Sequence, residues 1–153
     1  MVDYDVIIAG AGTGGSTTAY TLAKRGHSIL LIDRKERDNI GNKTCGDALG
    51  SHHITELREL IGIPELPKGI VEYAVNGIDL IAPDRDHRLR MEGRTTTGMS
   101  FNRLKMGQWF VGLAESAGAE VLASTRVKKL LFDSGKVSGV RISTDNGPDK
   151  DFT

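Results

Sequence analysis

The 153-residue sequence lacks several features that would each indicate a different class of protein. A single cysteine excludes a disulfide framework and favours a reducing, cytoplasmic setting. Twenty basic and 20 acidic residues give a formal net charge of zero, so nothing indicates a nucleic-acid partner. No apolar run approaches the roughly 20 residues that span a bilayer, and the first ten residues lack the basic stretch of a signal peptide. The length of 153 residues predicts one domain that is large enough to bury a real core.

Glycine is plentiful, with 19 residues, and it is concentrated after the first apolar run. Residues 6–8 form a continuous β-branched stretch, which predicts a strand buried on both faces. Gly10, Gly12 and Gly15 follow in the spacing G-x-G-x-x-G, with Gly14 between them. The first permits a tight turn, the second leaves room for a pyrophosphate, and the third lets a helix pack close to the strand.

A helix and a second strand complete this opening motif. The helix is predicted from near Ser16 to about Lys24, and its free N–H groups would face a bound diphosphate. Residues 28–33 ("SILLID") predict a second buried strand. Asp33 ends that strand, where its carboxylate can accept the hydroxyls of an adenosine ribose. The ligand is therefore NAD or FAD rather than NADP, although the neighbouring Arg34 weakens that exclusion.

Residues 34–50 are predicted to form a polar loop. Its charged start, residues 34–38, fits a solvated surface, with contact to the adenosine end of the ligand as the alternative. Small residues near its end would let the backbone approach a flat ligand closely, and the only thiol of the chain lies there. These residues are Cys45, Gly46, Asp47 and Ala48.

Residues 51–61 predict an amphipathic helix that starts from Ser51 as N-cap and ends at Gly62. Its apolar side comprises Ile54, Leu57, Leu60 and Ile61. The pair His52 and His53 suggests a metal site, but neighbours on a helix point about 100° apart. Since no other Cys/His group has ligand spacing, no metal is predicted.

Strand-like alternation follows from residue 70 to residue 91, with residues 82–87 as a turn between two strands. This break in the β-α-β rhythm predicts the start of a second sheet, which could cover the ligand. Residues 93–99 read as a polar connector.

Another helix is predicted over residues 100–118, capped by Asn102. Its expected buried stripe comprises Leu104, Trp109, Phe110, Leu113 and Ala114. Arg103, in the first turn, could meet phosphate or ribose oxygens, or be an ordinary surface charge. Residues 119–125 then predict a third strand of the parallel sheet, and residues 126–144 a hairpin that turns at 133–136.

Three stretches together, "DVIIAGAGTGGSTTAYTLAKRGHSILLID", "KTCGDALG" and "FNRLKMGQWFVGLAESAGAEV", resemble the FAD-dependent geranylgeranyl reductase family of p-hydroxybenzoate-hydroxylase-like flavoproteins. The resemblance implies an α/β, Rossmann-like FAD/NAD(P)-binding fold with a parallel sheet, a β-meander crossover and the start of a second antiparallel sheet. It implies a discontinuous FAD-binding domain over 1–68 and 101–153, with 69–100 as an inserted hairpin that begins a substrate domain. Family members are more than twice as long, so we expect an amino-terminal portion that binds FAD poorly alone.

The resemblance also implies which residues contact FAD. The diphosphate would be held by Gly10, Gly12, Gly14 and Gly15, and the adenosine ribose by Asp33. The side of the flavin ring would contact Cys45, Gly46 and Ala48. Arg103 would reach the ribose–diphosphate region, and the backbone of Val127 would contact adenine.

The implied activity is reduction of isoprenoid double bonds in geranylgeranyl lipids by hydride transfer from reduced flavin. Because the alkene also needs a proton, we expect Cys45 to supply or position it, with Asp47 as a weaker candidate; a packing role for Cys45 is the alternative. A following helix N-terminus would favour thiolate and oppose that role. The rival readings are another flavin oxidoreductase, either a monooxygenase or a quinone-linked dehydrogenase, and a non-catalytic dinucleotide-binding module.

The expected partners are an isoprenoid lipid and an external electron donor, either NAD(P)H or a ferredoxin-type protein. The expected location is cytoplasmic, with peripheral membrane contact as an option for the full-length protein.

Overall fold

The computed structural model describes residues 4–45, 47–93, 98–144 and 147–153. The chain divides into two compact units. The first unit comprises residues 1–43 and 104–153, and the second unit comprises residues 44–103. These bounds differ from the domain bounds expected from the sequence, since residues 44–68 cluster with the inserted strands. The assignment of one part to FAD and the other to substrate stays a prediction.

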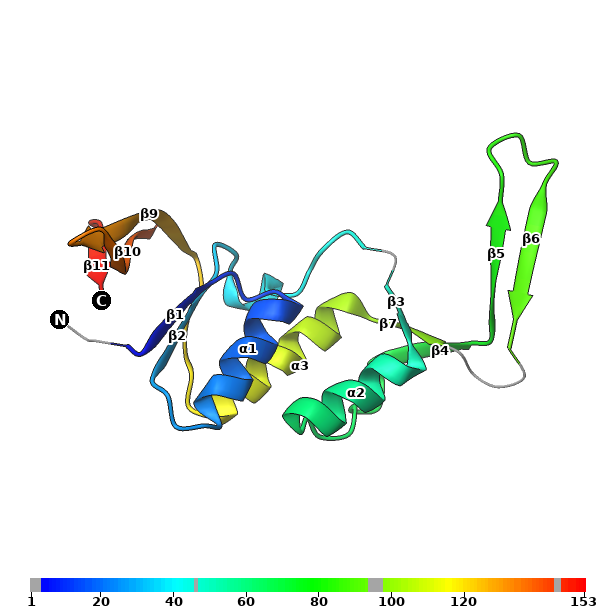
Figure 1. The fold of residues 1–153 in the computed structure, drawn as a ribbon, viewed down its shortest axis with the longest axis horizontal. Helices are drawn as coiled ribbons and strands as arrows, with labels where there is room; N and C mark the ends of the chain where they lie inside the picture. Colours follow the sequence, from blue (N-terminus) through cyan, green and yellow to red (C-terminus); the bar gives the residue numbers. More distant parts are fainter. Residues whose placement is uncertain (1–3, 46, 94–97, 145–146) are drawn as a thin grey trace. The chain divides into compact units, whose positions relative to one another are not determined.

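A three-stranded parallel sheet organises the first unit (Figure 1). It contains β1 (Val6–Ala9), β2 (Ile29–Ile32) and β8 (Glu120–Leu122), in the order β1-β2-β8. All four residues of β2 are buried, as the continuous apolar run predicts for a central strand covered on both faces. The predicted Rossmann-like fold with a parallel sheet is confirmed.

Two helices belong to this unit, α1 (Thr13–Ala23) and α3 (Arg103–Ser116), together with a 3-10 turn, η1 (Arg37–Asn39). Helix α1 packs against β1 and β2. It begins three residues before the predicted start, because the Ser16 N–H donates to the Gly12 carbonyl and the glycines themselves form the first turn. Helix α3 begins after the predicted residue 100, which instead pairs in a strand.

The buried face of α3 also differs from the expected stripe. Phe110 and Ala114 are buried as predicted, but Leu104 is exposed and Met106 and Val111 take its place in the core. Trp109 and Leu113 are half-buried. The burial follows one helical face that begins at Met106 rather than at the first residue of the helix.

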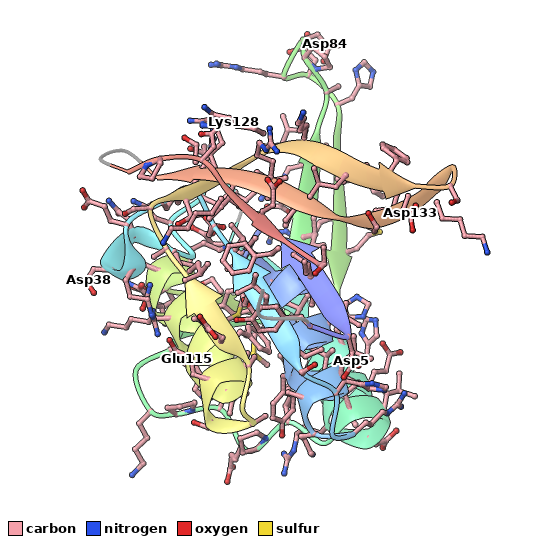
Figure 2. All side chains as sticks on the ribbon, turned by 90° about the vertical axis from the view of Figure 1, so that its left-hand side faces the viewer. Asp5, Asp38, Asp84, Glu115, Lys128 and Asp133 are labelled. Carbon is pink, nitrogen blue, oxygen red and sulfur yellow. The ribbon has the colours of Figure 1, made fainter. Side chains whose placement is uncertain are left out.

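A β-meander covers one face of the parallel sheet. It contains β9 (Thr125–Asp133), β10 (Lys136–Thr144) and β11 (Lys150–Phe152), in the order β11-β10-β9. Figure 2 shows Asp133 at the turn between β9 and β10. Ser134 and Gly135 have φ angles of 49° and 80° there, as a two-residue hairpin turn with two positive φ angles requires. Between the meander and the parallel sheet lies a core cluster of Leu30, Ile32, Val140 and Ile142.

The second unit contains one helix and five short strands. They are β3 (Ala48–Gly50), α2 (Ser51–Ile61), β4 (Val71–Val75), β5 (Gly77–Ile81), β6 (Arg88–Glu92) and β7 (Gly98–Phe101). The strands form one antiparallel sheet, β3-β7-β4, and one two-stranded sheet, β5-β6. Asp84 lies in the turn that joins β5 and β6, which is the predicted turn at 82–87 (Figure 2).

Four local predictions for the second unit need correction. Residues 48–50 form a strand rather than loop, because they pair with β7. The predicted first strand divides at Asn76, between β4 and β5. Gly50, not Ser51, is the N-cap of α2, and Leu60 is 77% exposed rather than on a buried side. No helix in the part of the chain that the structure describes is long and apolar enough to cross a membrane.

Candidate functional site

The turn between β1 and α1 requires glycine at two positions for different reasons. Gly10 has φ +108°, a conformation that side chains rarely adopt, and its N–H donates to the Ile32 carbonyl at 2.7 Å. A Cβ at Gly15 would lie 1.9 Å from the Gly10 carbonyl oxygen and 3.3 Å from Ile8 Cγ2. The helix therefore starts so close to the strand that only glycine fits at Gly15.

The other side of the same turn is open. A Cβ built at Gly10, Gly12 or Gly14 would meet no atom of the described residues within 4 Å. The first turn of α1, which is described throughout, carries no acidic residue that would neutralise the positive end of the helix dipole. A helix N-terminus with open space in front of its N–H groups is suited to bind a phosphate.

Asp33 faces this turn. Its Oδ2 accepts a hydrogen bond from the Ala11 N–H at 2.8 Å, and its Oδ1 accepts one from the Lys35 N–H at 2.9 Å. The two bonds fix the carboxylate between the glycine turn and the loop after β2. Each carboxylate oxygen has about two lone-pair sites, so each can also accept a ligand hydroxyl.

A pocket of about 290 Å³ lies beside Asp33. Its lining includes Gly10, Asp33, Arg34, Lys35, Arg126 and Val127. The start of β9 forms one wall, because the Thr125 N–H donates to the Asp33 carbonyl at 2.9 Å and the Ser124 N–H donates to the Lys35 carbonyl at 2.8 Å. One acidic and three basic side chains thus line a pocket next to the glycine-rich turn. Such a site can hold a nucleoside diphosphate.

The structure gathers six of the site residues expected from the sequence in the first unit. Asp33, Val127 and Gly10 line one pocket, and the other three glycines belong to the adjoining turn and first helical turn. Cys45, Asp47, Ala48 and Arg103 belong to the second unit, and Gly46 lies outside the described residues. Cys45 is exposed, Ala48 is an exposed residue of β3, and Arg103 is the half-buried first residue of α3.

Asp47 has two unusual features. Its φ angle is +50°, in the left-handed region that few residues other than glycine adopt. Its Oδ1 is buried and accepts no hydrogen bond from any residue that the structure describes. Strained backbone and an unsatisfied buried carboxylate oxygen are both more common at functional sites than elsewhere.

Sequence reasoning missed two parts of the pocket. Arg126 lines it, and the available signal was its place directly after the third parallel strand, whose end lies beside Asp33. The backbone N–H groups of Ala11 and Lys35 orient the Asp33 carboxylate, and a backbone donor has no signature in the sequence.

Comparison with known proteins identifies the family to which the chain belongs. The chain is 38% identical to the digeranylgeranylglycerophospholipid reductase of Sulfolobus acidocaldarius, over 89% of the chain and 28% of that protein. It is 27% identical to the reductase of the same name from Haloferax volcanii, over 94% of the chain and 32% of that protein. The chain therefore spans about a third of the length of these curated relatives.

Solved structures show the same fold. The crystal structure of a geranylgeranyl bacteriochlorophyll reductase-like protein from Thermoplasma acidophilum aligns with a TM-score of 0.84 and 26% identity, over 98% of the chain and 37% of that protein. A myxobacterial FAD-dependent halogenase aligns with a TM-score of 0.77 and 21% identity, over 99% of the chain and 36% of that protein. At this identity the likeness shows the fold alone. The sequence model described as FAD dependent oxidoreductase matches residues 5–153. The resemblance to geranylgeranyl reductases is thus confirmed, and the chain belongs to the FAD dependent oxidoreductase family.

Proposed function

We propose that this chain holds the ADP half of FAD within a reductase that saturates isoprenoid double bonds of a geranylgeranyl lipid. The observation that carries the proposal is the position of Asp33, whose carboxylate is fixed 2.8 Å from a backbone N–H of an open glycine turn. The names of the relatives support the lipid substrate, since they are digeranylgeranylglycerophospholipid reductases.

In this proposal the first unit binds the nucleotide end of the cofactor. The open glycine turn and the first N–H groups of α1 receive the diphosphate. Asp33 accepts the ribose hydroxyls with the lone pairs that Ala11 and Lys35 leave available. The backbone of Val127, at the wall of the pocket, contacts adenine.

The second unit supplies residues for the other end of the cofactor. Cys45, Gly46 and Ala48 would contact the side of the flavin ring, and Arg103 would reach the ribose–diphosphate region. The strained φ angle and the unsatisfied Oδ1 of Asp47 support a functional role for this segment.

When bound, FAD in its reduced form supplies the hydride for the reaction. An isolated alkene carries no carbonyl to stabilise charge, so the second carbon must receive a proton nearly at once. The Cys45 Sγ–H supplies that proton, and the exposed thiol regains it from solvent. Reduced FAD would supply both electrons as a hydride, which would form one C–H bond, and the thiol proton of Cys45 would form the other. The electron donor that reduces the cofactor is NAD(P)H or a ferredoxin-type protein.

Titration of FAD into the purified chain tests the nucleotide site. We expect weak binding that ADP displaces, because this chain contacts only part of the cofactor. Asp33→Ala should lower FAD affinity by at least about tenfold, since hydrogen bonds to a charged group are worth about 1.5–3 kcal/mol. Asp38→Ala is the matched control, an exposed carboxylate in η1. Equal affinity in both variants would refute the assignment of Asp33.

Because this chain alone is expected to be inactive, the activity is tested by incubating the full-length protein that contains it with digeranylgeranylglycerophospholipid, FAD and dithionite. Mass spectrometry should show a gain of one hydrogen molecule for each double bond reduced. Oxygen consumption with an unchanged lipid would instead identify a different flavin chemistry. For Cys45→Ser, retained lipid reduction with intact FAD binding would remove the thiol from the mechanism.

A further inference from the structure

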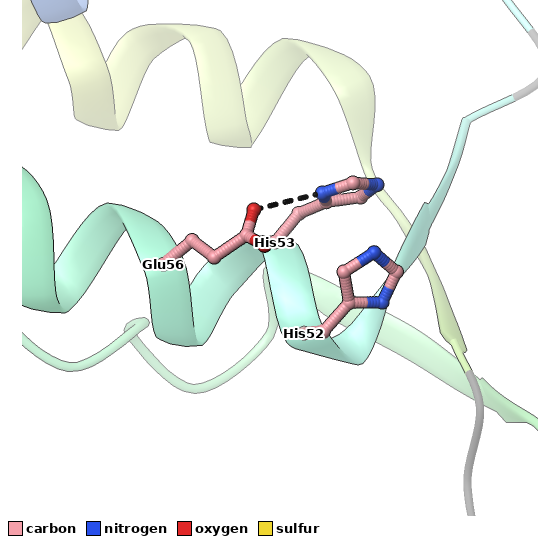
Figure 3. A group of neighbouring side chains, drawn as sticks. All are labelled: His52, His53 and Glu56. Carbon is pink, nitrogen blue, oxygen red and sulfur yellow. Dashed lines mark hydrogen bonds and ion pairs between the residues drawn. The ribbon is translucent and has the colours of Figure 1, made fainter.

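Three side chains of metal-ligand type project from the start of α2 in the second unit. They are His52, His53 and Glu56, and all three are exposed (Figure 3). One ligand atom from each lies within 4.8 Å of the ligand atoms of the other two. None of these residues belongs to the proposed flavin site.

The helix brings the three groups together through Glu56. It follows His52 by four residues and His53 by three, and both spacings place side chains on one helical face. His53 Nδ1 lies 3.2 Å from Glu56 Oε2. The two imidazole rings also converge, with centroids 3.8 Å apart and planes tilted by 47°. The side chains of adjacent residues point about 100° apart on an ideal helix, but these two imidazole rings lie next to each other.

Gly50, the N-cap of α2, provides the room for this arrangement. A Cβ at Gly50 would lie 2.6 Å from His52 Cε1 and 2.8 Å from His52 Nδ1. The His52 ring therefore lies back over Gly50, toward His53, and this position is open to the ring only because residue 50 has no side chain. The gap at Gly50 is a second observation, independent of the types of the three ligand residues.

We propose that His52, His53 and Glu56 bind a divalent metal ion of the zinc class, with water at a fourth position. Two imidazoles and one carboxylate form a set that Zn²⁺ accepts with three protein ligands and an open position, whereas Ca²⁺ and Mg²⁺ favour oxygen ligands. Zinc–ligand bonds of about 2.0–2.2 Å require the ligand atoms to approach one another to roughly 3.2–3.6 Å. Rotation of exposed side chains supplies that movement.

Two electrostatic effects act on the bound ion. The helix dipole disfavours a cation at this end of α2, by no more than about fivefold in affinity. The Glu56 carboxylate offsets that effect, since it contributes a full negative charge.

Zinc titration with a competing chromogenic chelator tests the site in the purified chain. We expect one tight equivalent in the parent protein and a loss of at least about tenfold in His53→Ala and in Glu56→Gln, because even changes outside the ligand sphere cost about 10–100-fold. His87→Ala is the matched control. His87 Nδ1 also lies near a carboxylate three residues away, 3.1 Å from Asp84 Oδ2, with no second histidine beside it.

Gly50→Ala tests the geometry without touching a ligand atom. Its φ angle of −63° suits alanine, so the variant should fold, which circular dichroism verifies, while the displaced His52 ring should weaken zinc binding. Histidine NMR resonances should shift on zinc addition for His52 and His53 but not for His87. The proposal is overturned if His53→Ala and Glu56→Gln bind zinc like the parent, or if His87→Ala loses as much affinity as they do.

Discussion

The parallel sheet of the first unit and the β5–β6 hairpin of the second both contain apolar strand residues, but the sheet buries them and the hairpin exposes them. Leu30 and Ile32 of β2 are at most 1% exposed, and they pack on Val140 and Ile142. In the hairpin, Ile78 pairs with Met91 and Leu80 pairs with Leu89, so these four side chains share one face. Each of the four is between 48% and 57% exposed.

The opposite face of the hairpin is charged and internally paired. Asp79 accepts hydrogen bonds from Arg88 and from Arg90, whose Nε lies 2.8 Å from Asp79 Oδ1. Arg90 Nη1 also lies 3.2 Å from Glu92 Oε1. Exposed ion pairs contribute little to stability, and an isolated two-stranded hairpin is marginal in water. The first unit thus has its own buried core, whereas the hairpin has an exposed apolar face.

The largest expected effect distinguishes two glycines of the glycine-rich segment at the start of α1. Gly15→Val should prevent the turn from folding, because even the Cβ would lie 1.9 Å from the Gly10 carbonyl. Gly14→Ala should leave stability equal or raise it by up to about 1 kcal/mol, since its Cβ meets open space within α1 and alanine favours helix. Thermal unfolding monitored by circular dichroism measures both.

The Gly14→Ala variant also distinguishes an effect on folding from an effect on ligand binding. If the open side of the turn receives a diphosphate, the added methyl group should weaken FAD binding in a protein that is at least as stable as the parent. Unchanged FAD affinity would place the diphosphate away from Gly14.

The next effect compares one leucine from each region. Leu30→Ala should cost about 2–5 kcal/mol in the free energy of unfolding, because the side chain is fully buried and leaves a cavity. Leu80→Ala should cost less than about 1 kcal/mol, since Leu80 is 52% exposed. Urea unfolding measures both variants. A similar cost at the two positions would show that another molecule or segment covers the hairpin face in solution.

The parts of the fold that the sequence predicted are those with a local signature. Continuous apolar runs predicted β1 and β2, and glycine spacing predicted the turn, because each signal lies within a few residues of the structure it specifies. Strand β3 was missed because three residues carry no periodicity, and only their pairing with β7 makes them a strand. The division at Asn76 likewise depends on which partner each strand finds.

The candidate site likewise contains residues that the sequence could predict and groups that it could not. Asp33 could be predicted from its place after the second strand, but the two N–H groups that orient it could not, because they belong to the backbone. The His52–His53 contact was missed because ideal helix geometry separates adjacent side chains, whereas the absence of a side chain at Gly50 lets one ring fold back.

The smallest expected effect is the pH response of the hairpin. Hydrogen bonds from Arg90 and then Arg88 hold the pKa of the Asp79 carboxyl well below its usual range. A carboxyl whose pKa is lower in the folded state stabilises that state above its unfolded pKa, about 3.9, and this stabilisation disappears as the pH falls through the folded pKa. The hairpin should therefore loosen only below about pH 4. NMR signals of the Arg88 and Arg90 side chains, followed from pH 6 to pH 2, measure this loosening.

Asp79→Asn should remove the response, whereas Asp133→Asn, in the turn between β9 and β10, should retain it. If Asp79→Asn retains the response as well, the Asp79 pairing is not what holds the charged face of the hairpin together.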